Sequence, residues 1–297
     1  MNARERGFLL LSSNLGDPER HPLSTAQLRV LGERVASAER IAQDRDLEPR
    51  DIQALGYGRE MAERIVHLLE DEQVLDHYLR RGQRSGCVPI SRVSDGYPAV
   101  LRQRLGLDAP GCLWAKGDLS LLERCMVSLV GSREIREENR NFAREVGDQA
   151  ARQGYVLVSG NARGADRTAQ ESCLAAGGSV ICVVADELAC HSPRQNMLYI
   201  SEDGFDQPFS AQRALSRNRV IHSLGSCTFV AQCGYQHGGS WDGTVKNLRF
   251  GWSGVFCFDD GSAATELLCH MGAECINVGE LNNIRLLSGM KISLFNQ

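Results

Sequence analysis

Two short loops in this sequence combine glycine, a hydroxyl and arginine just before a segment with helical spacing. The first is Gly131-Ser132-Arg133, and the second runs from Ser159-Gly160 to Arg163-Gly164. Glycine allows close backbone approach, and a planar guanidinium holds a phosphate through two parallel hydrogen bonds. The first turn of a helix adds free N–H groups and a partial positive charge. Either loop alone is compatible with a tight turn, but the pair predicts a site for a phosphate-bearing ligand.

Two later segments extend this candidate site. Arg217-Asn218-Arg219 sets two cations around an amide, and alternate residues of an extended segment share a face, which suits phosphate or base contacts as well as a solvated surface. Gly239 and Ser240 supply backbone amides and a hydroxyl where another helix begins, and the neighbouring Trp241 either stacks on a base or packs against the sheet. The candidate phosphate-binding residues are Gly131, Ser132, Arg133, Ser159, Gly160, Arg163, Gly164, Arg217, Asn218, Arg219, Gly239 and Ser240.

The same loops lack the signatures of several enzyme classes. Neither Gly-x-Gly-x-x-Gly nor the Gly-x-x-x-x-Gly-Lys-Ser/Thr pattern follows the first two loop-bearing strands, which weighs against an NAD enzyme and an ATPase. Asp166 is expected to pin Arg163 or to cap its helix rather than to catalyse. The 11 cysteines are scattered and never spaced Cys-x-x-Cys, so neither a disulfide nor a zinc site is expected. We predict no catalytic residue, no cofactor and no metal.

Short apolar runs must position these loops. They cover 127–130, 155–158, 180–184, 227–230 and 255–258, and segments of helix length separate most of them. Strands alternating with helices indicate βαβ units and a parallel sheet covered on both faces. In such sheets ligands bind beyond the carboxyl ends of the strands, where these loops lie. The sequence predicts an α/β, extended Rossmann-like, mostly parallel sheet.

The first 86 residues are expected to form a small all-helical domain, with the Rossmann-like domain spanning 87–297. Ser24 is a candidate N-cap for a helix whose apolar residues recur every three or four positions. Gly56-Tyr57-Gly58 separates two further short helices and resembles a helix-hairpin-helix, or SAM-like, arrangement. A plain helical packing module and a partner-docking module remain alternatives.

Composition and charge narrow the class of protein. The chain has 297 residues, is 42% hydrophobic and carries a net charge of −4, which is typical of a globular protein and shows no global basic field. All cationic side chains except Lys116, Lys246 and Lys291 are arginine, which indicates either a coding bias or phosphate binding. No apolar run is long enough for a membrane span or a signal-peptide core, so we expect a cytoplasmic protein with no membrane partner.

Seven motifs in order and spacing resemble the DNA-processing protein A (DprA/Smf) family, from about residue 87 to 275. Besides the loops described above, they include Asp95-Gly96-Tyr97-Pro98, Leu113-Trp114-Ala115-Lys116-Gly117-Asp118 and Gly177-Gly178. The resemblance implies an extended Rossmann domain that binds single-stranded DNA without catalysis, forms a homodimer and loads a RecA-type recombinase. By position it assigns the basic residues of the site to Arg133, Arg163, Arg217 and Arg219.

The sequence departs from the family pattern at three places. Gln170 stands where a histidine commonly ends the second motif, and Asp259-Asp260-Gly261 replaces a Pro-Gly and adds negative charge near the expected site. We also expect no C-terminal winged helix, since only about 20 residues follow Ile276. These departures leave the binding site intact and weigh against recombinase loading. They suit a divergent member, including an accessory factor of a defence system or mobile element.

Three other functions remain open. The protein is alternatively a nucleotide-binding sensor, or an enzyme like the phosphoribohydrolases on a related fold. Those enzymes need a glutamate after the paired-glycine loop, whereas Asp242 is the only nearby carboxylate here. A scaffold whose helical N-terminus docks a partner is a third reading.

Overall fold

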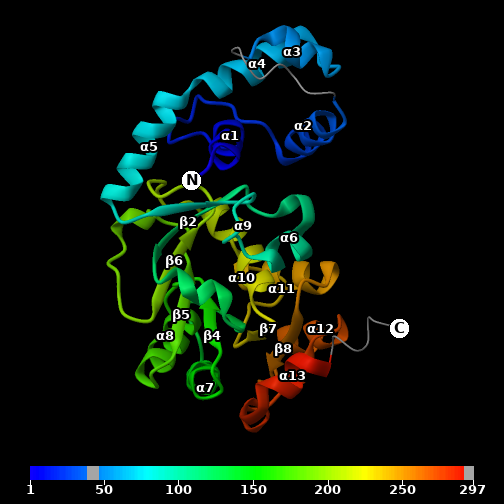
Figure 1. Ribbon diagram of the computed structural model, residues 1–297. Helices are drawn as coiled ribbons and strands as arrows, with labels where there is room; N and C mark the ends of the chain where they lie inside the picture. The colour runs from blue at the N-terminus through cyan, green and yellow to red at the C-terminus, as the bar shows by residue number, and fades with distance from the viewer. Residues whose placement is uncertain (39–46, 291–297) are drawn as a thin grey trace.

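The sheet at the centre of the protein is mostly parallel. A computed structural model describes residues 1–38 and 47–290, and in this part of the chain nine strands pair in the order β1-β2-β6-β5-β4-β3-β7-β8-β9 (Figure 1). The strands are β1 (Val88–Ser91), β2 (Cys112–Gly117), β3 (Met126–Val130), β4 (Val156–Ser159), β5 (Ser179–Val183), β6 (Met197–Ser201), β7 (Cys227–Val230), β8 (Gly254–Phe258) and β9 (Glu274–Ile276). The β1–β2 and β2–β6 pairs are antiparallel, and the other pairs between these strands are parallel. The expected Rossmann-like α/β fold is confirmed.

Helices precede the sheet and then alternate with its strands. They are α1 (Ala3–Ser12), α2 (Thr25–Ser37), α3 (Pro49–Ala54), α4 (Arg59–Glu70), α5 (Glu72–Arg84), α6 (Ala99–Leu105), α7 (Glu137–Arg152), α8 (Ala165–Ala175), α9 (Ala211–Ser216), α10 (Asn218–Leu224), α11 (Gly239–Phe250), α12 (Ala263–His270) and α13 (Ile284–Met290). The two units expected from the sequence, 1–86 and 87–297, contain residues 39–46 and 291–297. These two segments, and with them Lys291, lie outside the described part of the chain.

Helices cover both faces of the sheet, which explains why its strands are continuous apolar runs. In β3, Val127 and Leu129 pack in one buried cluster with α7, including Phe142. Met126 and Val130 belong to the cluster on the opposite face, with residues of α6, α10 and α11. Because successive side chains of a strand point to opposite faces, burial on both sides requires apolar residues at consecutive positions.

The five N-terminal helices lie at one end of the sheet (Figure 1). Ser24 caps α2 as expected, because its side chain accepts a hydrogen bond from the backbone N–H of Gln27. Gly56 separates α3 from α4 with a φ of +84°, a conformation that glycine adopts without strain. One cluster, which includes Leu31 and Ile65, is formed by these helices and the segments that connect them, without residues of the sheet.

Helices α1 and α5 share the core of the sheet. Leu10 and Leu75 belong to the same buried cluster as the sheet residues that pack on α7 and α8. Tyr78 of α5 contacts the rings of Trp114 and Phe205, with centroids 5.3 and 4.8 Å away. The helical N-terminus is thus packed onto the sheet rather than linked to it by a free tether.

One expectation about cysteine is wrong. Cys269, at the end of α12, forms a disulfide with Cys275 in β9. The tight turn between helix and strand brings their Cα atoms to 6.2 Å, within the range that a disulfide requires. Counting cysteines and searching for Cys-x-x-Cys spacing does not detect a bridge created by such a local turn.

The described residues offer neither a membrane span nor a metal cluster. Within 1–38 and 47–290, no helix combines the length and the apolar character needed to cross a bilayer. In the same ranges, no group of three or more histidine, cysteine, aspartate or glutamate side chains is arranged to hold a metal ion.

Candidate functional site

A cavity of about 600 Å³ opens at the carboxyl ends of the central strands. The loops after β3 and β7 line it, together with the start of α8, the junction of α9 and α10 and the beginning of α11. A smaller hollow of about 290 Å³ adjoins it, shares Arg133, Phe209 and Arg217 with it, and adds Gly160 and Arg163. Residues from four separate sequence segments therefore meet around one connected space.

The loop after β3 is held in place by its neighbours. The Ser132 N–H donates to the Gln232 carbonyl at 2.9 Å, and the Ser132 carbonyl accepts from the Ala165 N–H at 3.1 Å. A Cβ on Gly131 would lie 2.4 Å from the Cβ of Ala165, so only glycine fits between the loop and α8. These contacts fix the backbone from which Arg133 projects.

Arg133 is the accessible guanidinium of the larger cavity. Its side chain is exposed, and no carboxylate of residues 1–38 and 47–290 lies within ion-pair distance of it. Arg163 lines only the smaller hollow and pairs with Glu134 at 3.1 Å. Both members of that pair are largely solvent-exposed, so the pair is weak and an anion can displace Glu134.

Asp166 shapes the loop after β4. The backbone N–H groups of Gly160 and Ala162 donate to its Oδ2 at 3.0 and 3.2 Å. Burial raises the pKa of this carboxyl, and the Arg217 guanidinium opposes that shift. Asp166 therefore holds the loop instead of pinning Arg163, which pairs with Glu134.

Gly164 and Ser159 support the same loop from within. Gly164 has a φ of +83°, and a Cβ there would lie 2.4 Å from the Arg133 carbonyl oxygen, so the two loops approach one another only because this residue is glycine. Ser159 is fully buried, and its Oγ accepts a hydrogen bond from the Gln170 amide at 2.5 Å. The Ser159 hydroxyl is thus a structural group and does not face the cavity.

Arg217 is a buried wall of the cavity. Its guanidinium lies against Gly160, where an added Cβ would be 1.7 Å from Nη1, and Nη1 donates to the Val183 carbonyl at 2.8 Å. Nε has no hydrogen-bond partner in the described part of the chain, and burial lowers the pKa of the group. Arg217 thus joins the ends of β4 and β5 and contributes positive charge beneath the cavity surface.

Asn218 and Ser240 tie the beginning of α11 to the site. The Asn218 amide donates to the Gly239 carbonyl at 2.9 Å, and the Ser240 hydroxyl donates to the Gly131 carbonyl at 2.7 Å. Gly238, Gly239 and Ser240 all line the cavity. Their backbone N–H groups belong to the cap and first turn of α11, where intrahelical acceptors are lacking.

Arg219 does not reach this cavity, contrary to the expectation from the sequence. It pairs with Glu202 at 2.6 Å and lines another cavity, of about 730 Å³, which shares Leu215 and Asn218 with the larger cavity but is not lined by the loops after β3 and β4. The expectation assumed an extended segment, whereas Arg217 has helical backbone angles and α10 begins at Asn218. Two positions along a helix differ by about 200°, so Arg217 and Arg219 point to different sides.

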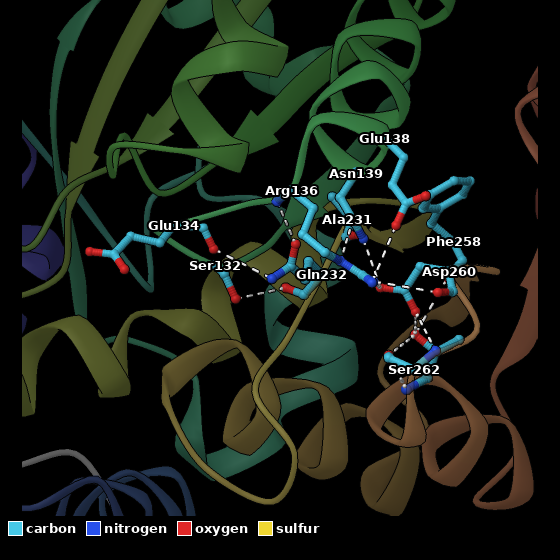
Figure 2. A network of polar contacts seen from close by, with 11 residues as sticks. Ser132, Glu134, Arg136, Glu138, Asn139, Ala231, Gln232, Phe258, Asp260 and Ser262 are labelled. Atoms are coloured by element: carbon cyan, nitrogen blue, oxygen red, sulfur yellow. Dashed lines mark hydrogen bonds and ion pairs between the residues drawn. The ribbon is translucent and has the colours of Figure 1, made fainter.

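The acidic segment after β8 is also directed away from the cavity. Asp260 forms an ion pair with Arg136 at 2.5 Å and accepts a hydrogen bond from the Asn139 amide at 2.8 Å (Figure 2). Burial alone raises the pKa of Asp260, but hydrogen bonds from Ser262 and Asn139 outweigh it and lower the pKa. Arg136 therefore neutralises the charge of Asp260, which anchors its loop to the start of α7, while the exposed Asp259 lines a different cavity, next to α12.

Phe209 is a site residue that the sequence patterns do not reveal. Its ring is 56% exposed and lines both the larger cavity and the smaller hollow. It belongs to the irregular segment before α9, outside every motif, so no periodicity identifies it. The one sign of it in the sequence is an isolated aromatic residue between Pro208 and Ser210. Ser210 is the N-cap of α9.

Comparison with known proteins gives one family and consistent relatives. The model of DNA recombination-mediator protein A matches residues 89–251, more than half of the chain. DNA processing protein DprA of Bacillus subtilis strain 168 is 29% identical over 212 residues, covering 66% of this chain and 69% of the relative. The Streptococcus pneumoniae protein of the same name is 32% identical over 160 residues, covering 50% of this chain and 55% of the relative. Protein Smf of Escherichia coli is matched over 41% of its length.

Solved structures agree with this fold. The structure of DNA processing protein A from S. pneumoniae has a TM-score of 0.72 at 24% identity, covering 96% of this chain and 98% of the other. The protein from Helicobacter pylori, whose structure is described in terms of its single-stranded DNA binding mode, has a TM-score of 0.56 at 23% identity. That match covers 67% of this chain and 95% of the other.

Proposed function

Because this chain belongs to the DNA recombination-mediator protein A family, we propose that it binds single-stranded DNA in the cavity beyond β3, β4 and β7. The single observation that carries the proposal is Arg133, an exposed guanidinium without a carboxylate partner in the described chain, which projects where the loop after β3 faces the first turn of α11. The single-stranded DNA binding mode of the H. pylori relative supports the same ligand class.

Different side chains contact the phosphate, stack on the base and position the loops. Arg133 and the N–H groups of Gly239 and Ser240 hold a phosphate, which carries no sequence information. The exposed ring of Phe209 offers a face for one base, since base stacking on aromatic rings tolerates every sequence. Arg217, Asp166 and Gly164 act as positioning residues, because they set the loops without reaching into solvent. Arg163 adds an accessible cation in the smaller hollow.

Binding without catalysis fits the same lining. Acid–base chemistry needs a group that is free to exchange a proton with substrate. In the described chain, Asp166 is the carboxylate that lines the larger cavity, and it already accepts two backbone hydrogen bonds. The exposed imidazole of His237 also lines the cavity, and no carboxylate of the described residues pairs with it. We propose binding without a reaction, because His237 lacks, among these residues, an acidic partner that would orient it as a general base.

The size of the cavity favours a second candidate, a free nucleotide. A volume of about 600 Å³ lies within the range of small-molecule sites. A nucleotide sensor would use the same phosphate-binding groups and would need no binding groups beyond this cavity. Competition between the two ligands separates these functions.

Partners and domain organisation follow the family as proposals. A homodimer and a RecA-type recombinase are the protein partners that the family resemblance implies, and a cytoplasmic location suits them. We also propose the division into a helical unit of residues 1–86 and a Rossmann unit of residues 87–297. The beginning of β1 at Val88 supports this boundary, whereas the shared packing of α1 and α5 indicates that the units fold together.

Fluorescence anisotropy with labelled oligothymidylate tests the proposal on the full chain. We expect single-stranded DNA to bind more tightly than duplex of equal length, with a log affinity that falls against log salt by about 0.7 for each neutralised phosphate. Unlabelled mononucleotide in excess should not displace the strand. Full displacement by mononucleotide, or affinity independent of salt, would instead support the nucleotide sensor.

A further inference from the structure

A third hollow adjoins the smaller one and lies between α8, the segment that follows β5 and the beginning of β6. It has a volume of about 390 Å³ and shares Asn161 and Asp186 with the smaller hollow. The smaller hollow in turn shares Arg133, Phe209 and Arg217 with the main cavity. The three spaces therefore adjoin one another in sequence, as a groove does and as a single closed site does not.

We propose that this third hollow binds a second stretch of the same single strand that occupies the main cavity. The inference rests on the proposed function and adds a binding region to it. We call the hollow the distal subsite and define it by Arg167, Gln170, Glu171, His191, Ser192 and Arg194. We infer a polymeric occupant because each of the three adjoining hollows is lined by at least one arginine, whereas a single nucleotide needs only one such site.

Two free cations give the distal subsite its affinity for phosphate. The side chains of Arg167 and Arg194 are exposed and line the hollow. Among residues 1–38 and 47–290, no carboxylate lies within ion-pair distance of either guanidinium. Solvated, unpaired arginines bind phosphate without first breaking an internal ion pair.

Two acidic side chains at the distal subsite, Asp186 and Glu171, differ in how strongly they oppose a bound phosphate. Asp186, at the junction with the smaller hollow, is paired with His191 at 2.9 Å, which offsets its charge when the imidazole is protonated. Glu171 is exposed and lines the hollow without such a partner in the described chain. Glu171 therefore opposes a bound phosphate, and its removal should strengthen binding.

An ordered ring completes the subsite. The imidazole of His191 stacks on the ring of Tyr199, with centroids 4.7 Å apart and planes 22° from parallel. The contact of its Nε2 with Asp186 fixes the ring from the other end. A rigid polar ring beside two arginines suits a nucleotide, since sugar and base edges need hydrogen-bonding partners that do not move.

Comparing a short with a long oligonucleotide distinguishes binding in the distal subsite from the proposed binding in the main cavity. Labelled oligothymidylates of about 4 and about 12 nucleotides bracket the site size of one single-strand-binding fold. We expect Arg194→Ala to weaken the longer strand about three- to ten-fold, as expected for one screened phosphate contact, and to leave the shorter strand unchanged. Arg133→Ala should weaken both. Arg194→Lys keeps the charge and should recover most of the affinity.

Glu171→Gln supplies a test of opposite sign. This variant should bind the longer strand more tightly and the shorter strand as the wild type does. Equal effects of Arg194→Ala on both lengths, or no effect on either, would overturn the distal subsite while leaving the main cavity intact. Failure of the wild type to bind any oligothymidylate would overturn both the distal subsite and the proposed binding of single-stranded DNA in the main cavity. Circular dichroism of each variant confirms that these exposed substitutions leave the fold unchanged.

Discussion

We propose that Arg133 supplies most of the attraction of the main cavity for a phosphate, because it is exposed and pairs with no carboxylate of the described residues, whereas Arg217 is buried and Arg163 is paired with Glu134. We expect Arg133→Ala to weaken single-stranded DNA binding by at least ten-fold and to reduce the salt slope by about 0.7 for each phosphate that the variant no longer neutralises. Thermal stability should hardly change, since the side chain has no internal ion pair to break. Anisotropy titrations at several salt concentrations measure both quantities.

A second exposed arginine tests whether DNA affinity depends on the position of Arg133 or on the total charge of the protein. Arg144 is exposed on α7 and lines none of the cavities described above. Arg144→Ala removes the same charge and should leave the affinity and salt slope near those of the wild type. A similar loss of affinity for both variants would mean that the overall field, and not the cavity, attracts DNA.

Gly160 shows how one backbone position supports the site. A Cβ there would overlap the Arg217 guanidinium, so Gly160→Ala must displace a buried cation from the Val183 carbonyl. We expect a stability loss of about 1–3 kcal/mol, the usual cost of overpacking, together with weaker DNA binding. Chemical denaturation and anisotropy check the two effects. Gly96→Ala is the control, because a Cβ at Gly96 meets nothing within 4 Å.

At the scale of elements, the junction of α9 and α10 decides which arginines enter the cavity. The Arg-Asn-Arg pattern has the same spacing in an extended segment and in a helix, but its two cations share a face only in the former. The helical backbone at this junction directs Arg217 inward and leaves Arg219 with Glu202. Local residue types suggest cations for the site, and the secondary structure selects among them.

A buried histidine links α10, β7 and α11, and makes their packing sensitive to acid. Nδ1 of His222 accepts a hydrogen bond from the Asn247 amide at 3.1 Å and lies 3.3 Å from the Thr228 hydroxyl. Burial lowers the pKa of His222 from 6.5 to about 3. Between these values only the unfolded chain takes up the proton, so acid favours unfolding.

We therefore expect the free energy of unfolding to fall by about 1.4 kcal/mol per pH unit from this group as the pH drops below 6.5. His222→Gln should be less stable at neutral pH and should lose less stability down to about pH 4.5, above the main titration range of the carboxylates. His67→Gln, at an exposed position, should keep the wild-type slope. Denaturant unfolding at each pH gives the slopes, and equal slopes for His222→Gln and wild type would contradict the argument.

At the scale of the whole molecule, the shared core predicts cooperative unfolding of the N-terminal helices with the sheet. Leu75 of α5 is fully buried in the cluster that also contains sheet residues. Leu75→Ala should cost about 2–5 kcal/mol and should shift a single transition to lower denaturant. Far-ultraviolet circular dichroism and tryptophan fluorescence should report the same midpoint, since Trp114 lies in the sheet beside α5. Separate midpoints would show that the helices unfold independently.

The sequence by itself determined five strands of the sheet, β3, β4, β5, β7 and β8, and the loops that carry Gly131, Gly160 and Gly239, whereas β1, β2, β6 and β9 were not predicted. Consecutive apolar residues and glycine are local properties, since burial on both faces and close backbone approach leave few other residue types acceptable. The Ser24 cap is also predictable from the sequence, because a short side chain that accepts a hydrogen bond from the first turn of its helix is a local property.

Only the tertiary structure decided which charges remain free in the cavity. The exclusion of Arg219, the burial of Arg217, the neutralisation of Asp260 and the presence of Phe209 all depend on groups that are distant in the sequence. The Cys269–Cys275 bridge depended on a turn that brings together two residues that no pattern pairs. A charge acts on a ligand only when no internal partner is closer, and chain folding, not residue type, sets that distance.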